Sequence, residues 1–148
     1  MIAKKLTQSQ HKNEVVIVND NDEVIGTMPR AEAHENGTPH RIAIIFVENN
    51  NGEILVQVRI SSMLDHSSAG HVDPRESYLQ TAQRELKEEL GIEAELVSIG
   101  KGRSDERANK ERGNTNELEH RVHVFEVFVC KAEPGALAQD EVKSVYWE

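Results

Sequence analysis

The sequence predicts an α/β fold with a mixed β-sheet. One strongly signalled helix, over residues 78–90, stands between several apolar or alternating segments that are typical of strands. At 148 residues the chain has the size of one domain, and no repeat, linker or low-complexity tract divides it. We therefore expect residues 1–148 to form a single domain, with a flexible N-terminus over residues 1–12.

The helix is indicated by its boundaries as well as by its periodicity. Ser77 followed by Gln80 predicts a capping box, and Gly91 stands where a left-handed residue would end the helix. An apolar stripe recurs at helical spacing through Leu79, Ala82, Leu86 and Leu90.

Three glutamates, Glu85, Glu88 and Glu89, share one side of this helix because residues three and four apart are neighbours. They flank the apolar stripe, which shields them partly from water. Like charges at this spacing repel one another, and a divalent cation such as Mg²⁺ or Mn²⁺ would remove the conflict. A solvated acidic face is the alternative that the three residues alone leave open.

The segments predicted as strands are residues 14–18, 23–28, 41–47, 54–60, 92–99, 121–131 and 142–147. The turn at residues 49–52 predicts a hairpin between the third and fourth of these strands. Residues 30–35 predict a short helical turn. The charged segment 101–116 has no periodicity, so a loop is expected there.

Composition excludes several classes of function. The net charge of −9 argues against a nucleic-acid partner, and no apolar run approaches the roughly 20 residues of a membrane span. Cys130 is the sole cysteine, so no internal disulfide can form and a cytoplasmic location is expected. We expect Cys130 to be a small buried residue inside a strand.

The stretch from Gly70 to Ile92, GHVDPRESYLQTAQRELKEELGI, matches the pattern GX5EX7REUXEEXGU, where U is aliphatic, at every fixed position. This pattern is the Nudix box, and the chain resembles a Nudix hydrolase. The resemblance implies the Nudix fold, an α/β/α sandwich. It also implies metal-dependent cleavage of a diphosphate linkage in a nucleoside diphosphate derivative or a related small metabolite.

The resemblance also implies roles for the box residues. In the family the three box glutamates hold Mg²⁺ or Mn²⁺, with the carbonyl of the box glycine, here Gly70, as a further ligand. One of these glutamates could instead be the general base, and the sequence leaves open which one. Arg84 would fix the neighbouring carboxylates by charge-assisted hydrogen bonds, and Glu76 would brace the loop before the helix.

Outside the box the chain resembles, more loosely, isopentenyl-diphosphate isomerase, which shares the Nudix fold. The isomerase metal ligands match His34, His40, His71, Glu117 and Glu119. This match implies a second metal site for Mn²⁺, Zn²⁺ or Fe²⁺, and ordinary surface or hydrogen-bonding histidines are the alternative. Three further histidines match nothing and are interpreted as ordinary: His66, His120 and His123.

Ala69 separates the chain from the isomerase, which has a cysteine immediately before its box glycine. A methyl group cannot transfer a proton, so isomerase activity is disfavoured. A Nudix fold that binds a metabolite or a protein without turnover is a third hypothesis, and the complete box argues against it.

Arg41 and Arg59 are the candidate phosphate contacts, although each could be a surface arginine. Four basic residues of the predicted loop could close over a phosphate or remain solvated: Arg103, Arg107, Lys110 and Arg112. The expected partner is a small-molecule diphosphate. A homodimer is left open, because dimers are common among the resembled enzymes.

Overall fold

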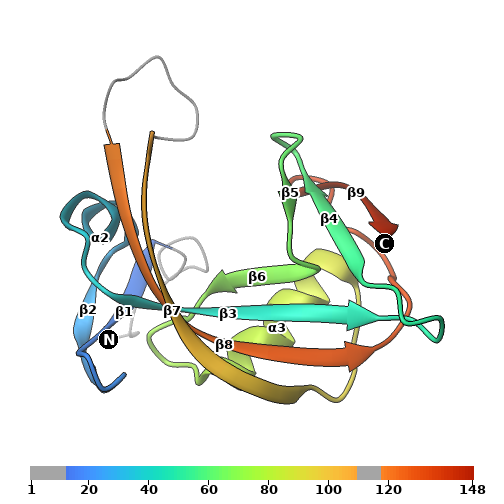
Figure 1. Ribbon diagram of the computed structural model, residues 1–148, viewed down its shortest axis with the longest axis horizontal. Coiled ribbons are helices and arrows are strands. Elements are labelled where there is room, and N and C mark those ends of the chain that lie inside the picture. The colour runs from blue at the N-terminus through green and yellow to red at the C-terminus, as the bar shows by residue number, and fades with distance from the viewer. Residues whose placement is uncertain (1–12, 110–117) are drawn as a thin grey trace, which may run out of the picture.

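The structure is a computed structural model, and it describes residues 13–109 and 118–148 (Figure 1). Most strands form one large sheet with the order β2-β1-β3-β8-β7, and β6 pairs with β3 beside this path. The strands of this sheet are β1 (Glu14–Val18), β2 (Val24–Pro29), β3 (His40–Glu48), β6 (Ser68–His71), β7 (Val97–Asn109) and β8 (Leu118–Lys131). Because β3 runs parallel to β8 and antiparallel to β6, the predicted mixed sheet is confirmed.

A smaller antiparallel sheet has the order β5 (Leu64–Asp65), β4 (Leu55–Arg59) and β9 (Val142–Trp147). The predicted turn before β4 forms, with the Gly52 N–H donating to the Asn49 carbonyl at 3.2 Å. The predicted hairpin is wrong, because the pairing described between β3 and the chain after the turn is a single bridge, Glu48 to Ile54. β3 pairs with β8 along one edge and with β6 over Ile42–Ile45 on the other, whereas β4 pairs with β5 and β9 in the second sheet.

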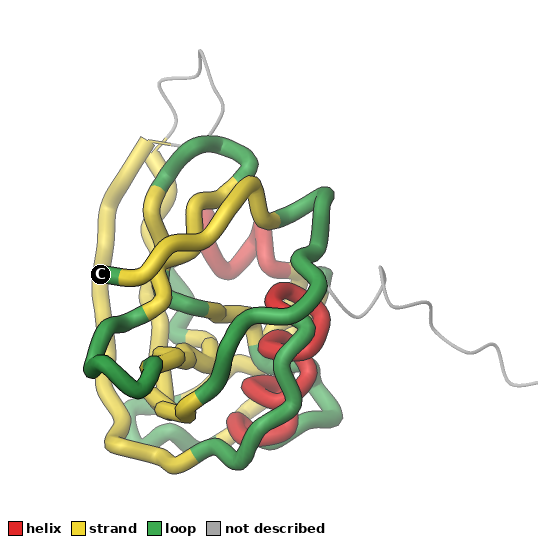
Figure 2. The backbone as a smooth tube through the Cα atoms, turned by 90° about the vertical axis from the view of Figure 1, so that its right-hand side faces the viewer, coloured by secondary structure: helices red, strands yellow, loops and turns green. Residues whose placement is uncertain are grey.

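Helix α3 (Tyr78–Leu90) forms a layer beside the strands (Figure 2). Its capping box is confirmed: the Ser77 hydroxyl accepts from the Gln80 N–H at 3.2 Å, and the Gln80 side chain accepts from the Ser77 N–H at 2.9 Å. The predicted end is confirmed as well, because Gly91 has a φ of 63°. Within the described ranges, no helix is long and apolar enough to span a membrane.

The buried side of α3 begins one residue earlier than the predicted stripe. Leu79 is 40% exposed, whereas Tyr78 is buried with its hydroxyl donating to Asp22 at 3.0 Å. The rest of the stripe is buried as predicted, at Ala82, Leu86 and Leu90. Ala43 of β3 lies in the same core, and so does Cys130 of β8, as expected for a small apolar residue.

A second helix, α2 (Arg30–Asn36), confirms the predicted helical turn. It lies at the opposite end of the large sheet from the small sheet (Figure 1). Ala33 is fully buried and packs against Val15 and Ile17 of β1, which fixes the helix on the sheet. The helix ends at Gly37 in a left-handed conformation, with a φ of 66°.

The loop predicted over residues 101–116 is wrong for residues 101–109, which belong to β7. This strand pairs antiparallel with β8 along its whole length. Most of residues 101–107 are exposed, so the sequence has no alternation of apolar and polar residues there. Backbone hydrogen bonds to β8, rather than burial of side chains, hold this part of β7 in place. The predictions for residues 1–12, Lys110, Arg112 and Glu117 fall outside the described residues.

Candidate active site

Strand β6 connects two clusters of candidate site residues. Ser68 and Gly70 face α3, where the Ser68 hydroxyl donates to Glu89 and the Gly70 backbone lies against Glu85. Because side chains alternate along a strand, His71 points to the opposite face of the sheet. The box glutamates and the histidines therefore lie on opposite sides of one short strand.

The first cluster consists of three carboxylates, Glu85, Glu89 and Glu141, with one oxygen of each within 4.8 Å of the others. We call this group the carboxylate cluster. Helix α3 provides two of its members. The sequence prediction missed Glu141, which lies 52 positions after Glu89 and carries no local signal of such a role.

Glu141 reaches the cluster because the chain before β9 caps the end of α3. The Gly135 N–H donates to the Leu90 carbonyl at 2.8 Å, and the Ala138 N–H donates to the Glu89 carbonyl at 3.0 Å. These bonds satisfy carbonyls that the helix end would leave unpaired. The Val142 N–H then turns back to the Ala138 carbonyl at 2.8 Å, which places Glu141 beside the helix.

Glu89 is 7% exposed, an unusual position for a carboxylate. Its Oε1 atom accepts hydrogen bonds from the Ser68 hydroxyl and from the Ala69 N–H. Burial raises the pKa of Glu89 to about 8, and the neighbouring Glu85 adds to the rise, although the Ser68 hydrogen bond opposes it. The ionised form of Glu89 therefore lacks a sufficient counter-charge in the protein itself.

Glu85 lies against the backbone of β6. A Cβ at position 70 would collide with its carboxyl group, so glycine is the residue that permits this approach. Burial raises the pKa of Glu85 to about 7, and the charges of Glu88 and Glu141 add to the rise, while Arg84 opposes it.

Arg84 is bonded to three carboxylates at once. Its Nη2 atom lies 3.0 Å from Glu76, and its Nη1 atom lies 2.8 Å from Glu85 and 3.3 Å from Glu88. Glu76 also accepts from the Thr81 hydroxyl at 3.0 Å, which ties the loop before α3 to the helix. Glu88 is 35% exposed and lies at the rim, outside the three-carboxylate cluster.

The two candidate phosphate contacts have different surroundings. Arg41 donates to the Asp22 carboxylate at 2.8 Å and its guanidinium lies 4.7 Å above the Tyr78 ring. Arg59 lies 3.9 Å from Asp65 and directly precedes Ile60, whose N–H donates to the Glu141 carbonyl. The chain thus places Arg59 next to the segment that holds the carboxylate cluster.

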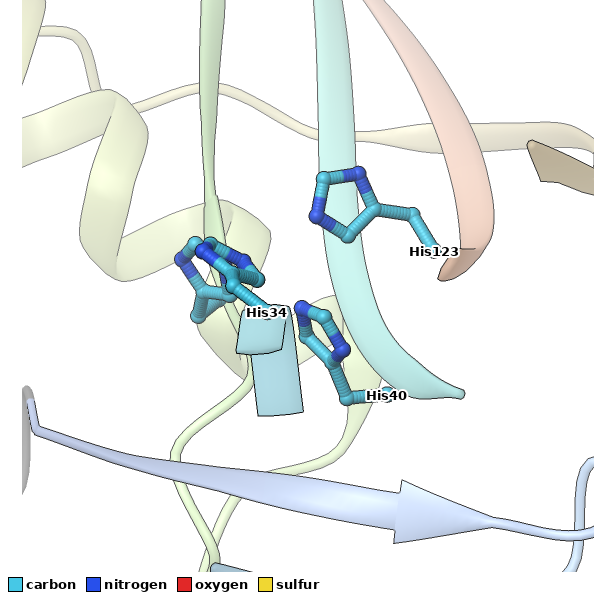
Figure 3. Close-up of side chains that lie close together, drawn as sticks. His34, His40 and His123 are labelled. Carbon is cyan, nitrogen blue, oxygen red and sulfur yellow. The ribbon is translucent and has the colours of Figure 1, made fainter. Parts of the chain in front are cut away.

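The second cluster, the histidine cluster, contains His34, His40, His71 and His123. One ring nitrogen of each lies within 4.8 Å of the others. The four rings come from α2, β3, β6 and β8, and His40 and His123 are direct neighbours in the parallel pairing of β3 with β8. Figure 3 shows His34, His40 and His123 turned toward a common centre.

The histidine cluster is electrically neutral at ordinary pH. Burial lowers the pKa of His34 to about 4 and that of His123 to about 3, and it lowers the pKa of His40 and of His71 as well. The His40 Nδ1–H donates to the Thr38 carbonyl at 2.9 Å, so its Nε2 atom has the free lone pair. Neutral imidazoles with free lone pairs are metal ligands.

The structure brings together the three histidines that the isomerase resemblance named, and it adds a fourth. His123, to which the sequence assigned no role, is this fourth member. A signal was present, because His123 lies four positions after Glu119 in one strand and so shares its face. Glu119 itself lies 3.8 Å from His34 and is bonded to Arg121.

Comparison with known proteins identifies the family. The family model of the NUDIX domain matches residues 38–148. The chain belongs to the NUDIX family. It is 33% identical over 141 residues to the uncharacterized Nudix hydrolase YfcD of Escherichia coli K12, which covers 90% of this chain and 72% of the relative.

Two further comparisons concern a curated relative and a solved structure. It is 34% identical over 92 residues to the isopentenyl-diphosphate Delta-isomerase of Pectobacterium atrosepticum, which covers 58% of this chain. The chain spans about half the length, 51%, of that isomerase. The crystal structure of DR0079 from Deinococcus radiodurans superposes with a TM-score of 0.64 at 21% identity, covering 90% of this chain and 82% of the other. The predicted Nudix fold is confirmed.

Proposed function

We propose that this protein is a metal-dependent hydrolase of a diphosphate linkage in a small metabolite, a nucleoside diphosphate derivative being the first candidate. The carboxylate cluster is its catalytic centre. The observation that supports this best is the burial of Glu85 and Glu89 side by side, with the pKa of both raised. Buried carboxylates without enough counter-charge favour a cation between them.

Glu85, Glu89 and Glu141 would hold Mg²⁺ or Mn²⁺, with the Gly70 carbonyl as a further ligand, because all these donors are hard oxygen atoms. When bound, the ion would neutralise charge on the phosphoryl oxygens and lower the pKa of an attacking water. The exposed Glu88 at the rim would complete the site once substrate is present.

The protein supplies orientation and a place for a proton. Glu89 keeps Oε1 bonded to β6, which leaves its Oε2 atom for the cation or for a proton taken from water. Arg84 fixes Glu85 relative to the rim. Arg59 and Arg41 would contact the phosphates, and Arg59 has the more favourable place, next to the chain that holds Glu141.

An isomerase acting on a prenyl diphosphate is the second candidate, favoured by the 34% identity to the isomerase and by the histidine cluster. Ala69 stands against it, because its methyl group has no proton to exchange. Ala69→Cys should give no hydrogen exchange into isopentenyl diphosphate, and exchange catalysed by the unaltered protein would establish the isomerase instead.

The test is the release of phosphate and monophosphate from nucleoside di- and triphosphates, nucleotide sugars, dinucleotides and prenyl diphosphates, with Mg²⁺ and with Mn²⁺. Glu89→Gln should lose at least about 100-fold in kcat. Glu93→Gln, a solvent-exposed glutamate just after α3, is the matched control and should retain full activity. Full turnover in Glu89→Gln would refute the assignment of the site. Tight binding of a metabolite without turnover in metal-loaded protein would favour a binding module.

A further inference from the structure

We propose that the histidine cluster binds one zinc-class transition-metal ion through the imidazole nitrogens of its four histidines. The ion would be a structural one. It would tie α2 to three strands of the large sheet, because His34, His40, His71 and His123 come from four different elements.

The geometry suits a single ion. Four nitrogens bound to one ion at about 2.0–2.1 Å lie about 3.3 Å apart in a tetrahedron and at most about 4.2 Å apart in any arrangement. The nitrogens of the cluster already lie within 4.8 Å of one another, so small side-chain rotations close the shell. Four protein ligands leave no open position for water, which is the pattern of structural zinc sites.

The Nε2 atoms of the histidine cluster are buried polar atoms whose hydrogen-bonding capacity is not used by the described residues. In the part of the chain that the structure describes, the Nε2 atom of each of the four rings is buried without a hydrogen-bond partner. Buried polar atoms are normally hydrogen-bonded, and leaving four unsatisfied in one place is costly. His40 is fully buried, and its Nδ1–H bond to Thr38 turns Nε2 toward the cluster.

Of the two predicted carboxylate ligands, Glu119 lies within the described residues, and its carboxylate is already engaged. Glu119 Oε2 lies 2.6 Å from the Arg121 Nε and 2.5 Å from its Nη2, and 3.8 Å from the His34 Nδ1. Glu119 therefore lies beyond hydrogen-bond distance of His34 and is held by Arg121. His123 takes the position of the fourth ligand.

The two clusters differ in the ions that they suit. The histidine cluster offers borderline nitrogen donors, which favour zinc and its neighbours, whereas the carboxylate cluster offers hard oxygens that favour Mg²⁺ or Mn²⁺. They lie on opposite faces of β6, so each can be removed by substitution without removing ligands of the other.

The test is a titration of the metal-stripped full-length protein with Zn²⁺ against a chromophoric chelator, and with Co²⁺ followed by its visible absorption. We expect one tight Zn²⁺ per chain that excess Mg²⁺ does not displace. His123→Ala and His34→Ala should each weaken Zn²⁺ binding by at least about 100-fold. The control His66→Ala removes a histidine outside the cluster, and Glu85→Gln/Glu89→Gln removes the carboxylate cluster; both should keep the tight site.

Circular dichroism of the metal-free variants distinguishes a loss of metal binding from a loss of folding. His34→Ala, on the surface helix α2, provides a second variant if His123→Ala does not fold. Glu119→Gln should keep the 1:1 stoichiometry and the Co²⁺ spectrum. Absence of tight Zn²⁺ binding in the unaltered protein would overturn the proposal. The proposal would also be overturned if Glu119→Gln lost the Co²⁺ spectrum while His123→Ala retained it. The metal ligands would then include the Glu119 carboxylate in place of His123.

Discussion

At the scale of single residues, the missing side chain of Gly70 decides how closely β6 approaches α3. A methyl group there would collide with the carboxyl group of Glu85. We expect Gly70→Ala to lose about 1–3 kcal/mol of stability and about 100-fold in kcat, because strand and carboxylate must separate. Gly26→Ala is the control, since a Cβ at that position meets nothing within 4 Å. Equal kcat values for the two variants would contradict this reason for the glycine.

Glu89 gives a prediction about pH in the metal-free protein. Its pKa is raised from an ordinary value of 4.5 to about 8, so the folded state favours the protonated form. The stability that this contributes is complete below pH 4.5 and is lost as the pH rises to about 8. The Glu89→Gln variant has no such proton to lose. Its free energy of unfolding relative to the unaltered protein should therefore rise across this range.

Urea denaturation of both proteins in the presence of a chelator measures the difference between their free energies of unfolding. Titratable groups that both proteins share largely cancel in this difference. Curves that stay parallel from pH 4.5 to 8 would show that Glu89 is not held in its protonated form. Saturating Mg²⁺ should reduce the difference in slope, because the cation favours the ionised carboxylate.

The residues that the sequence revealed are those with a local pattern. Glu85 and Glu89 are one helical turn apart in a complete motif, and their side of the helix follows from spacing alone. Glu141 and His123 were missed because their partners are distant in the chain. Glu141 depends on the chain that caps α3, and His123 on the register that places it beside His40.

At the scale of elements, α3 is stabilised at its start by the capping box. Ser77→Ala should cost about 1 kcal/mol of stability, because the Gln80 N–H loses its acceptor. The affinity for Mg²⁺ should fall only slightly, since Glu85 and Glu89 lie at the other end of the helix. Thermal unfolding and Mg²⁺ titration measure both effects. Ser61→Ala, an exposed serine in a turn, is the control, and an equal loss of stability there would contradict the role of the cap.

The segments that were predicted wrongly are those whose structure depends on strand pairing rather than on a local sequence pattern. The capping box and Gly91 fix both ends of α3 locally, so the sequence predicts that helix closely. A turn signal at residues 49–52, in contrast, does not reveal that β4 pairs with the distant strand β9 instead of with β3. The charged part of β7, residues 101–109, was missed because pairing with β8, rather than burial of an alternating face, orders it.

At the scale of the whole molecule, the fold places an oxygen-donor cluster and a nitrogen-donor cluster on the two faces of the large sheet. Strand β6 contributes directly to the surroundings of both clusters, with Ser68, Ala69 and Gly70 at the carboxylate cluster and His71 at the histidine cluster. If both proposals hold, activity and thermal stability depend on different metals. An ion at the histidine cluster would join four elements, whereas an ion at the carboxylate cluster would join α3 to the chain before β9.

Removal of all metal should therefore lower both the unfolding temperature and the rate of hydrolysis, and the two should be restored separately. Stoichiometric Zn²⁺ should restore the unfolding temperature without restoring turnover, because it fills the nitrogen site first. Mg²⁺ added afterwards should restore turnover with little further change in unfolding temperature. In His123→Ala, Zn²⁺ should no longer raise the unfolding temperature, while Mg²⁺ still supports hydrolysis in the fraction that folds. If Mg²⁺ alone restored both the unfolding temperature and the rate of hydrolysis, the proposal that the two clusters bind different metals with different roles would be contradicted.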